Sequence, residues 1–599
     1  MLNMKISTPA ILTAIAVVPA IGQTRTAPSN NQPNVIIVLI DDQGYGDIGA
    51  HGHPFLRTPN MDKLYRESVH FTDFHVAPMC SPSRGQLMTG VDALRNGCTA
   101  VCQGRSMVRE DIPMLSNYFE KAGYSTGIFG KWHMGDSYPY RPQDRGFQEV
   151  LSFRAWGLPS LASNWKNSTL NQNGTGDEYT DPVLAHNGTD IAYQGYSGDI
   201  FFTEAMKYMT KCQENKKPFF VYLPDNLAHA PYRIPSKYSE PYEKIGVWNG
   251  VKVPAEYYGM IANIDENLGR LDAFLSKHGM NENTILLFLS DNGTGSAEAA
   301  EIYNGGMRGM KADLWDGGHR VPFFFRWPGA EIQHSRDVTE LTEAQDIAPT
   351  LLELCGIKVD DTHPMDGVSL VPLLRGEPWS YGDRTLPIQY QISGARWVAA
   401  AVPFKKWRLL EGDHLYNVAK DPHQDSNVAD QFPDILKTMS AYYESWHQVA
   451  HAEFEKIRYI HLGHPGIPQV ILYASDWQGD YCDNPTRLEA GSARGAWDVE
   501  VESNGVYRVE LSRWPFEAGK SLREGVKGLS DQRGVRPIAS ATLNIADVSK
   551  TSKTLAGQTL AIFEVSLKSG KTRLETIFGD DKCDPLCGAF YVRVTQLPE

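Results

Sequence analysis

Continuous apolar runs, each followed by a stretch with helical periodicity, constrain the fold of this chain more than any other feature. The segment Asn34–Ile40 reads NVIIVLI, which is typical of a strand buried on both faces of a sheet. Similar runs lie at residues 125–129, 218–223 and 284–289, and residues 254–278 have the periodicity of a helix. This alternation predicts an α/β fold with a large, mostly parallel β-sheet flanked by helices.

The pattern changes twice beyond the α/β part. Short apolar runs at 386–390, 397–402 and 406–410, followed by a helical pattern at 430–447, predict a small α+β subdomain. From about residue 460, apolar and polar residues alternate between Gly and Asn turns, which predicts an antiparallel β-sandwich. A chain of 599 residues is too long for one core. The predicted α/β domain, small subdomain and β-rich accessory domain span residues 34–385, 386–459 and 460–599.

The N-terminus has the features of an export signal. Lys5 supplies a positive start, residues 10–21 are apolar, and the small residues Ala20 and Gly22 follow at the spacing that a signal peptidase recognises. The apolar stretch is too short for a stable membrane anchor, and no other segment has transmembrane character. We therefore predict a signal peptide at residues 1–22 and an exported protein, periplasmic or secreted. The start of a buried helix is the alternative.

The net charge and the cysteine count restrict partners and architecture. The formal net charge of −14 argues against nucleic acid as a partner, because phosphate binding needs a basic face. An anionic substrate would need a local cationic pocket, since the overall field repels it. Eight cysteines are too few for a disulfide scaffold in a chain of this length. Pairing of Cys583 and Cys587 with each other or with Cys482 stays open.

Polar residues follow four of the predicted buried strands at the points where the strands end. In chain order they are Asp41 and Asp42, Lys131 and His133, Asp225, Asn226 and His229, and Asp291 and Asn292. The carboxyl ends of parallel strands meet at one edge of a sheet, where ligands bind. Each residue alone could be a cap or a turn residue, but four such strand ends together favour one common site. Three of these carboxylates, those of Asp41, Asp42 and Asp291, together with the amide oxygen of Asn292, suit Ca²⁺ or Mg²⁺ better than zinc.

A cysteine stands at a predicted helix start, in the run Cys80-Ser81-Pro82-Ser83-Arg84. Pro82 suits the first helical turn, which places Cys80 at or just before the cap. A helix N-terminus presents free N–H groups to an anion, and Arg84 could brace the same anion from one turn further on. From these residues alone, Cys80 could equally be a structural cysteine or a thiolate nucleophile.

The motifs together resemble the type I, formylglycine-dependent sulfatases of the alkaline phosphatase superfamily. The run from Cys80 to Arg84, followed by Thr89-Gly90, resembles the C-x-P-S-R signature of that family. Further segments resemble other family motifs in the same order, over roughly residues 34–447. They are Asp41-Asp42, Gly130-Lys131-Trp132-His133-Met134-Gly135, Ala228-His229-Ala230-Pro231, Asp291-Asn292-Gly293, Arg308-Gly309-Met310-Lys311, Gly317-Gly318-His319-Arg320-Val321-Pro322, Leu415-Tyr416-Asn417 and Asp421-Pro422.

Two positions depart from the family pattern, and the region beyond residue 460 resembles no family. Ala228 stands where Pro usually precedes the His, and Asp316 stands where Glu is more common. Neither departure removes a residue with a chemical role. The resemblance implies an alkaline phosphatase-like α/β fold.

The resemblance also implies the cofactors. Cys80 is expected to be oxidised to Cα-formylglycine (3-oxoalanine) by a formylglycine-generating or anaerobic maturation enzyme. A divalent cation, Ca²⁺ with Mg²⁺ as the alternative, is expected on Asp41, Asp42, Asp291, Asn292 and the modified Cys80.

The resemblance implies a mechanism as well. The hydrate of the aldehyde would attack the sulfur of a sulfate ester, and its second hydroxyl would drive the later expulsion of sulfate. Arg84, Lys131 and Lys311 would hold the sulfate oxygens. His133 is the expected base, with Asp291 as the alternative. His229 is the expected general acid, with Lys311 as the alternative.

Two rival functions stay open at this point. A phosphonate or phosphodiester hydrolase of the same superfamily would use the same metal set. An inactive glycan-binding protein could stack sugars on Trp477, Trp497 and Trp514 of the β-rich region, although their strand periodicity favours core packing. The extra β domain suggests a sulfated saccharide as the substrate, and loops such as 156–190 would read the sugar.

Overall fold

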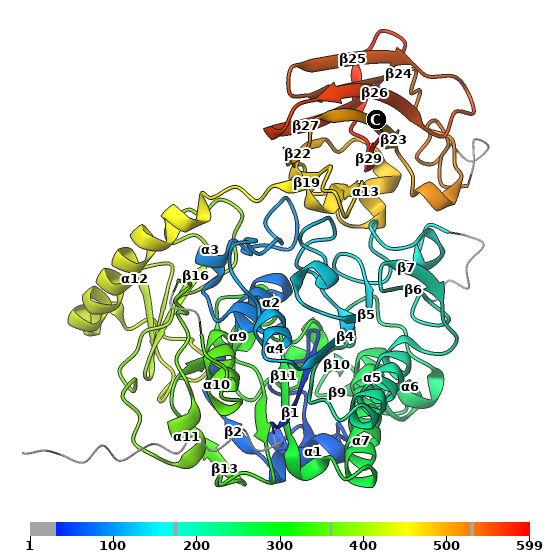
Figure 1. Cartoon of the computed structure of the whole chain (residues 1–599). Coiled ribbons are helices and arrows are strands. Elements are labelled where there is room, and N and C mark those ends of the chain that lie inside the picture. Colours follow the sequence, from blue (N-terminus) through cyan, green and yellow to red (C-terminus); the bar gives the residue numbers. More distant parts are fainter. Residues whose placement is uncertain (1–31, 172–177, 360–361, 528–531, 599) are drawn as a thin grey trace, which may run out of the picture. The chain divides into compact units, whose positions relative to one another are not determined.

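The computed structural model describes residues 32–171, 178–359, 362–527 and 532–598, so the predicted signal peptide at 1–22 lies outside the described residues. Residues 33–599 form one compact unit. Its main element is a ten-stranded sheet with the order β13-β2-β12-β11-β1-β8-β4-β5-β6-β7 (Figure 1). The bounds of these strands are β1 Asn34–Ile40, β2 Val69–Phe71, β4 Ser125–Lys131, β5 Glu149–Phe153, β6 Val183–His186, β7 Thr189–Ala192, β8 Phe219–Pro224, β11 Thr284–Ser290, β12 Phe323–Arg326 and β13 Arg336–Val338.

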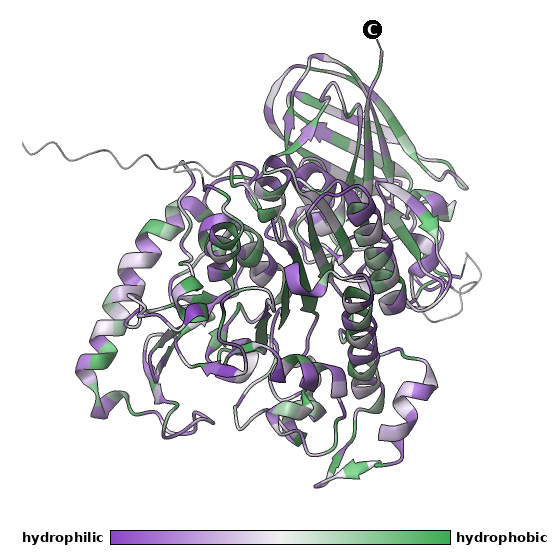
Figure 2. Ribbon diagram, turned by 60° about the horizontal axis from the view of Figure 1, so that its bottom comes forward, coloured by the Kyte–Doolittle hydropathy of each residue, from purple (hydrophilic) through white to green (hydrophobic). Residues whose placement is uncertain are grey.

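The centre of this sheet is parallel, as predicted. Strands β11, β1, β8, β4 and β5 pair in parallel, with Asn34 opposite Thr284 and Val35 opposite Phe220. The strands β6, β7 and β12 towards the two edges run antiparallel to their neighbours. The four apolar runs identified in the sequence are four of the five parallel strands, and the fifth, β5, was not predicted. Figure 2 shows that hydrophobic residues predominate along the central strands.

Helices cover both faces of the sheet. Alternate residues of β1 point to opposite faces, so each face presents apolar side chains against which helices pack. Ile36 and Val38 pack with α1, α5 and α7 in one core, and Val35 and Ile37 pack with α2, α4 and α10 in another. The predicted helix at 254–278 is α7. The bounds of the helices before residue 380 are α1 Pro59–Arg66, α2 Cys80–Thr89, α3 Ala93–Asn96, α4 Leu115–Lys121, α5 Ser197–Glu214, α6 Ser236–Glu243, α7 Ala255–Lys277, α8 Ala297–Ile302, α9 Asp316–His319, α10 Ile347–Leu354 and α11 Val371–Arg375.

Two short strand pairs and a small α+β unit complete this part of the chain. Strand β3 (Phe74–His75) pairs with β14 (Thr342–Glu343), and β9 (Val247–Trp248) pairs with β10 (Val251–Lys252). The α+β unit is an antiparallel sheet packed against one long helix, as the sequence predicted. Its elements are β15 Ile388–Gln389, β16 Ala400–Phe404, β17 Trp407–Leu410, β18 His414–Asn417 and α12 Pro433–Phe454.

The C-terminal region consists of two mainly antiparallel sheets that share one hydrophobic core. Trp477, Trp497 and Trp514 are at most 1% exposed and lie in that core, so core packing is confirmed and they offer no surface to a glycan. The bounds of the elements are β19 Ile460–Leu462, β20 Gln469–Tyr473, β21 Gln478–Gly479, α13 Pro485–Ala490, β22 Gly495–Val501, β23 Gly505–Ser512, β24 Ser540–Ile545, β25 Val548–Lys553, β26 Ala561–Leu567, β27 Gly570–Gly579, β28 Pro585–Cys587 and β29 Tyr591–Gln596.

The C-terminal core is completed by residues from the first third of the chain. Met107, Tyr140 and Leu161 are buried in it. The Tyr140 hydroxyl donates to the Tyr459 carbonyl at 2.9 Å, and the Tyr591 hydroxyl donates to the Leu161 carbonyl at 2.5 Å. The β-rich region is therefore anchored to the α/β part by a shared core. The boundaries at 385 and 459 stay predictions.

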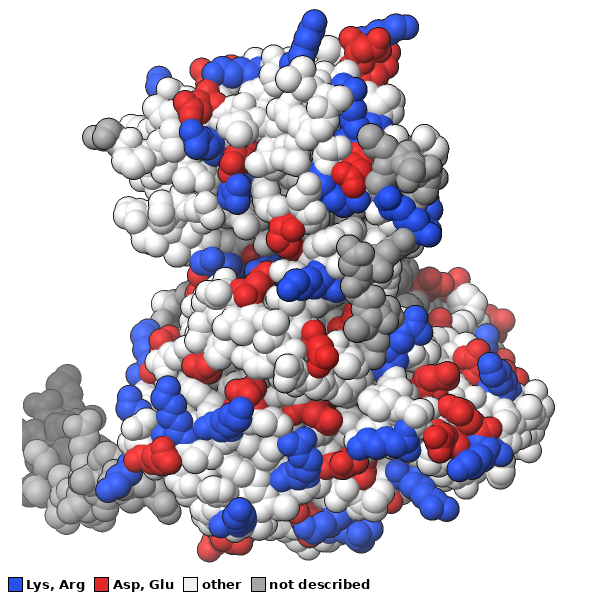
Figure 3. Space-filling model, turned by 90° about the vertical axis from the view of Figure 1, so that its right-hand side faces the viewer, with Lys and Arg blue, Asp and Glu red and all other residues white. Residues whose placement is uncertain are grey.

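Two surface properties bear on the partners of the chain. On the face shown in Figure 3, acidic and basic side chains are interspersed and no patch of one sign stands out. Within the described residues, no helix has the length and apolar character needed to cross a bilayer, and all eight cysteines are unpaired.

His461 of the C-terminal region contacts one carboxylate of the α/β part and one of its own region. His461 Nε2 lies 3.1 Å from Glu110 Oε2, and His461 Nδ1 lies 2.8 Å from Glu502 Oε1. Burial opposes the charged form of His461, but hydrogen bonding and attraction by Glu110 and Glu502 outweigh burial and raise its pKa above the usual 6.5. This contact therefore stabilises the junction only while His461 is protonated.

We predict a loss of stability as pH rises through the raised pKa of His461, because a group with a raised folded-state pKa stabilises only below that pKa. Urea unfolding between about pH 5 and pH 9 measures the effect. The variant His461→Gln should lack this part of the pH dependence, whereas His414→Gln, at an exposed histidine, should keep it. An identical slope for His461→Gln and the parent would contradict the prediction.

Candidate active site

The predicted site residues meet at the carboxyl edge of the parallel strands. Asp41 and Asp42 follow β1, Asp291 and Asn292 follow β11, and Lys131 is the last residue of β4. His133, His229 and Lys311 reach the same place from loops, and Cys80 and Arg84 lie in α2. The structure thus brings together the residues predicted as catalytic or metal-binding, whereas Asp225, which was also predicted at this edge, takes no part in their ion pairs.

The backbone at this edge is held in unusual conformations. Gly130 has φ +129°, and a Cβ there would lie 1.9 Å from the Pro224 carbonyl oxygen, so only glycine fits between β4 and β8. Asp42 and His133 have φ of 62° and 56°, which residues other than glycine rarely adopt. Such strain is concentrated at functional sites, where the surrounding structure enforces it.

Three cations and three carboxylates form a buried cluster. The guanidinium of Arg84 donates to Asp291 Oδ2 at 2.7 and 3.0 Å, and Lys131 Nζ donates to Asp41 Oδ2 at 2.7 Å. Lys311 Nζ lies 2.8 Å from Asp42. Arg84 also donates to the Lys131 carbonyl at 3.0 Å, which ties α2 to β4. The three cations are thus gathered at one place in an acidic protein, each paired with a carboxylate.

Burial and neighbouring charges shift the ionisation of this cluster in opposite directions. Burial raises the pKa of Asp41 to about 8, against the attraction of Lys131. Burial also opposes ionisation of Asp42, but Lys311 and His229 outweigh it and hold the pKa of Asp42 below its usual range. The surrounding charges therefore stabilise the ionised form of Asp42. They do not fully offset the cost of burying an ionised Asp41.

The oxygen atoms of the cluster fit a hard divalent cation. Asp41 Oδ1 and Asn292 Oδ1 are buried and have no hydrogen-bond partner in the described part of the chain. Ligand atoms of Asp41, Cys80 and Asp291 lie within 4.8 Å of one another. Unpaired buried oxygens are costly, and a cation would satisfy them. Asp41, Asp42, Asp291 and Asn292 supply the oxygen-rich set that Ca²⁺ and Mg²⁺ prefer.

Cys80 is the first residue of α2, with Met79 as the N-cap. Its side chain is buried, which raises the pKa of the thiol. Cys80 Sγ lies 3.3 Å from His133 Nδ1, and His133 Nε2 lies 3.0 Å from the Val101 carbonyl oxygen. A carbonyl can only accept, so Nε2 carries the proton and Nδ1 presents its lone pair to residue 80.

His229 lies next to Asp42. Its Nε2 is 3.7 Å from Asp42 Oδ2, and its Nδ1 donates to the Ala230 carbonyl at 2.5 Å. Burial, followed by the charge of Lys311, lowers the pKa of His229 to about 3. Nε2 therefore faces the site as an acceptor in the substrate-free protein.

Three residues near the site were not singled out from the sequence, although Trp156 begins the loop 156–190 that was expected to read the sugar. Tyr257 donates to Asp47 Oδ2 at 2.6 Å below the loop that carries Asp42. Val101 fixes the His133 tautomer, and the Trp156 ring lies 5.1 Å from the His229 ring. Trp156 follows β5, so recognising that short strand would have placed the ring at the same sheet edge. Asp225, in contrast, accepts from the backbone of its own turn and takes no part in the ion pairs of the cluster.

A second cluster of possible metal ligands is already satisfied by protein groups. His75, Asp316 and His319 lie close together, but Arg408 donates to Asp316 at 2.9 Å and to Asp73 at 2.7 Å. The positive charge of the guanidinium occupies the place that a cation would take. Asp316 therefore anchors the small α+β unit, to which Arg408 belongs.

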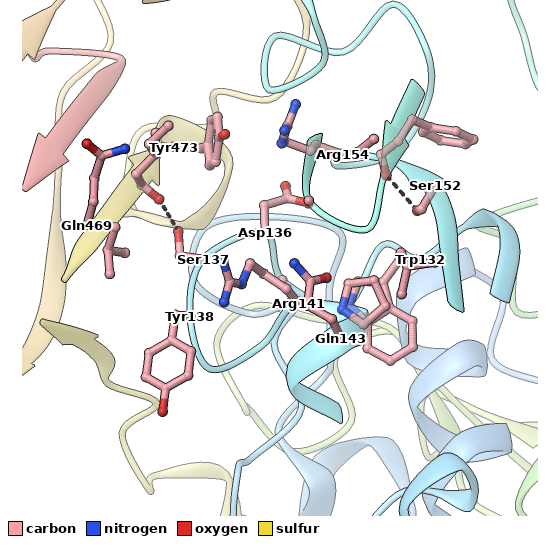
Figure 4. Close-up of a pocket in the computed structure, with 18 residues that line it drawn as sticks. Trp132, Asp136, Ser137, Tyr138, Arg141, Gln143, Ser152, Arg154, Gln469 and Tyr473 are labelled. Carbon is pink, nitrogen blue, oxygen red and sulfur yellow. Dashed lines mark hydrogen bonds between the residues drawn. The ribbon is translucent and has the colours of Figure 1, made fainter. Parts of the chain in front are cut away.

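A separate cavity of about 210 Å³ lies where the C-terminal region meets the α/β part (Figure 4). Ser137 donates to the Ile471 carbonyl at 2.8 Å across this junction, and Arg154 lies over the Tyr473 ring. None of the predicted catalytic or metal-binding residues lines the cavity, although Trp132 stands between Lys131 and His133 in the sequence. The chemistry is therefore assigned to the charged cluster and not to this cavity.

The architecture and the cluster define an alkaline phosphatase-like hydrolase site. The sulfatase family model matches residues 33–357, more than half of the chain, and the model described as N-sulphoglucosamine sulphohydrolase, C-terminal, matches residues 310–447. The chain belongs to the sulfatase family, whose members are sulfuric ester hydrolases.

Curated relatives and solved structures agree with this assignment. The chain is 29% identical to N-acetylgalactosamine-6-sulfatase of Rattus norvegicus, over 57% of this chain and 66% of that protein, just under two thirds of its length. It is 28% identical to arylsulfatase J of Mus musculus, over 66% of this chain and 67% of that protein. The structure of Ps i-CgsB in complex with k-i-k-neocarrahexaose is similar, with a TM-score of 0.63, 27% identity and coverage of 71% of this chain and 95% of that chain.

We predict that Ca²⁺ stabilises the protein through the unpaired oxygens of the cluster. At a hundredfold excess over the dissociation constant, binding adds about 2.7 kcal/mol to the free energy of unfolding. Differential scanning fluorimetry with and without Ca²⁺ measures the shift. The variant Asp41→Asn should lose the shift, and Asp265→Asn, at a buried carboxylate on α7 away from the site, should keep it. An equal shift in Asp41→Asn and the parent would show that the ion binds elsewhere.

Proposed function

We propose that the chain hydrolyses the sulfate ester of a carbohydrate and releases inorganic sulfate. The observation that carries the proposal is the buried cluster beside Cys80 in which Arg84, Lys131 and Lys311 pair with three carboxylates. Family membership supports sulfate as the anion. The names of the similar proteins, an N-acetylgalactosamine-6-sulfatase and a complex with k-i-k-neocarrahexaose, support a sugar as the group that carries it.

In this proposal the nucleophile is made from Cys80. A maturation enzyme transfers two electrons from Cys80 to an oxidant, molecular oxygen or an anaerobic electron acceptor, and the carbon–sulfur bond is replaced by a carbonyl as the sulfur leaves as sulfide. The aldehyde then adds water to form two hydroxyl groups on one carbon. One hydroxyl oxygen attacks sulfur, the bond from sulfur to the sugar oxygen breaks, and sulfate is held on residue 80. Loss of the proton from the second hydroxyl restores the aldehyde and expels sulfate. A serine at position 80 would lack that second hydroxyl.

His133 is proposed as the base for this nucleophile. Its Nδ1 lone pair faces residue 80 at 3.3 Å, and the Val101 carbonyl holds the proton on the other nitrogen. Burial and the charges of Lys131 and Arg84 keep the pKa of His133 well below its usual value, so the ring is neutral before the reaction. Asp291 is the weaker alternative, because both of its oxygens already accept hydrogen bonds.

The leaving oxygen is proposed to receive its proton from His229, with Lys311 as the alternative. His229 must first gain a proton on Nε2, and an anionic sulfate ester against the ring favours that charged form. Lys311 already carries its proton, because Asp42 and the other anions of the site raise its pKa despite burial. Both groups lie at Asp42, whereas His133 lies at Cys80.

A divalent cation, Ca²⁺ or Mg²⁺, would offset the charge of the substrate when bound. The residues that would hold it are Asp41, Asp42, Asp291, Asn292 and residue 80. Lys131 and Lys311 would complete the neutralisation by donating to the sulfate oxygens that do not react. We also propose export through residues 1–22, so that the enzyme meets a carbohydrate outside the cytoplasm.

The proposal predicts that Cys80→Ala abolishes sulfate release from an aryl sulfate, with a fall of at least about a thousandfold in kcat/KM, because the nucleophile is lost. Ion chromatography of the released sulfate measures the rate. The matched control is Cys355→Ala, another buried cysteine at the end of α10, which should retain activity. Undiminished release by Cys80→Ala would remove the proposal.

The rival function is a phosphonate or phosphodiester hydrolase with the same metal set. The ratio of kcat/KM for an aryl sulfate to that for an aryl phosphodiester separates the two. Our proposal requires the sulfate to be the better substrate, and a preference for the phosphodiester would assign the chain to the rival class.

A further inference from the structure

The loop after β5 places an aromatic ring at the edge of the charged cluster. Trp156 is half-buried, and its ring centroid lies 5.1 Å from that of His229 at an interplanar angle of 34°. Trp477, Trp497 and Trp514, which belong to the β-rich region, are fully buried. Trp156 therefore differs from them in keeping part of its surface open beside a proposed catalytic group.

The structure holds this ring from two sides. The indole N–H of Trp156 donates to the Asp483 carbonyl at 2.9 Å, and the backbone N–H of Leu161 donates to the same carbonyl at 3.2 Å. Asp483 comes from the C-terminal region, and Trp156 packs against the core of that region. The pyrrole edge of the ring is thus anchored.

The backbone before the ring is also constrained. Ala155 has φ +53°, a conformation that alanine rarely adopts, and its N–H donates to both oxygens of Asp136 at 3.0 Å. The N–H of Asp136 in turn donates to Asp476 Oδ2 at 3.2 Å, again in the C-terminal region. Strain that several contacts enforce is typical of a group placed for a function.

The anchoring segment of the C-terminal region lies close enough to the charged cluster to influence it electrostatically. Burial raises the pKa of Asp483 to about 6. Local hydrogen bonds and the positive charge of Lys131 act in the opposite direction. Tyr390 interacts with both Cys80 and Asp483, whose charges add to the effect of burial and raise its pKa to about 12. Asp483 is therefore linked to the site through Trp156, which it anchors and whose ring lies beside His229.

We propose that Trp156 is the platform on which the sugar ring bearing the sulfate ester stacks, and that Asp483 of the C-terminal region positions it. The inference rests on the proposed function: His229 faces the leaving oxygen, so a ring beside His229 faces the sugar and not the sulfate. The apolar face of a pyranose packs against an aromatic ring, and the indole offers the largest such face. The C-terminal region thereby contributes to substrate specificity.

Steady-state kinetics with chondroitin sulfate and carrageenan hexasaccharides test the platform. Trp156→Ala should raise KM about tenfold or more and change kcat less, because the lost contact binds the sugar in ground and transition states alike. Trp156→Phe keeps a ring but loses the bond to Asp483, so its KM should lie between those of the parent and Trp156→Ala. The matched control is Trp379→Ala, a half-buried tryptophan outside this loop whose indole N–H also donates to a backbone carbonyl, that of Ser369, and whose ring packs against Tyr381. Its KM should stay within about twofold of the parent value.

Inhibition by inorganic sulfate separates loss of the platform from collapse of the site. Sulfate occupies only the cationic pocket, so its inhibition constant in Trp156→Ala should stay within about twofold of the parent value. Parallel weakening of sulfate and sugar binding would mean that the substitution deforms the pocket, and would overturn the inference. A KM unchanged by Trp156→Ala would overturn it as well.

Direct binding keeps this test independent of turnover. Isothermal titration calorimetry of the same hexasaccharides is run on Cys80→Ala and on Cys80→Ala combined with Trp156→Ala. Weaker binding by the double variant supports the platform even if the parent releases no sulfate, which would contradict the proposed hydrolysis alone. Equal binding by both variants, or binding by neither, overturns the platform whatever the parent does.

Discussion

The structure depends on charge neutralisation at the carboxyl ends of β1 and β11. Asp41, Asp42 and Asp291 follow these two strands and are almost completely withdrawn from water. Burying three carboxylates side by side is very costly unless cations accompany them. Arg84, Lys131 and Lys311 supply that charge from α2, from β4 and from the loop before α9, so each element that meets at the site is tied to it by an ion pair.

The same interaction explains why the site suits a sulfate ester. Its three cations are paired with three carboxylates, and Asp41 Oδ1 and Asn292 Oδ1 have no hydrogen-bond partner among the described residues, so they are available to a metal ion. With a cation bound, the pocket would carry excess positive charge within an otherwise acidic protein, which is what a sulfate group requires. The pocket is built from rigid strand ends, so little reorganisation is needed when charge develops.

Much of this site could be predicted from the sequence, because buried parallel strands have a strong local signal. The runs before Asp41, Lys131 and Asp291 identify the strand ends, and the geometry of a parallel sheet brings those ends together. Trp156 could not be found in this way, since β5 reads EVLSF and lacks a continuous apolar run. Its position beside His229 depends on contacts with Asp483, more than three hundred residues further along the chain.

The C-terminal region shows the same limit of local reasoning. Its strands follow from a period of two, but the sequence does not reveal that Met107, Tyr140 and Leu161 complete its core. Those contacts join residues that are far apart in the sequence, and they pack the C-terminal region against the part of the chain that carries the active site.

The central claim is that residue 80 carries the nucleophile in oxidised form. Mass spectrometry of the peptide that contains residue 80, taken from active protein made in its native host, tests this claim most directly. The account predicts the mass of the aldehyde or its hydrate. An unmodified thiol throughout a fully active sample would contradict it.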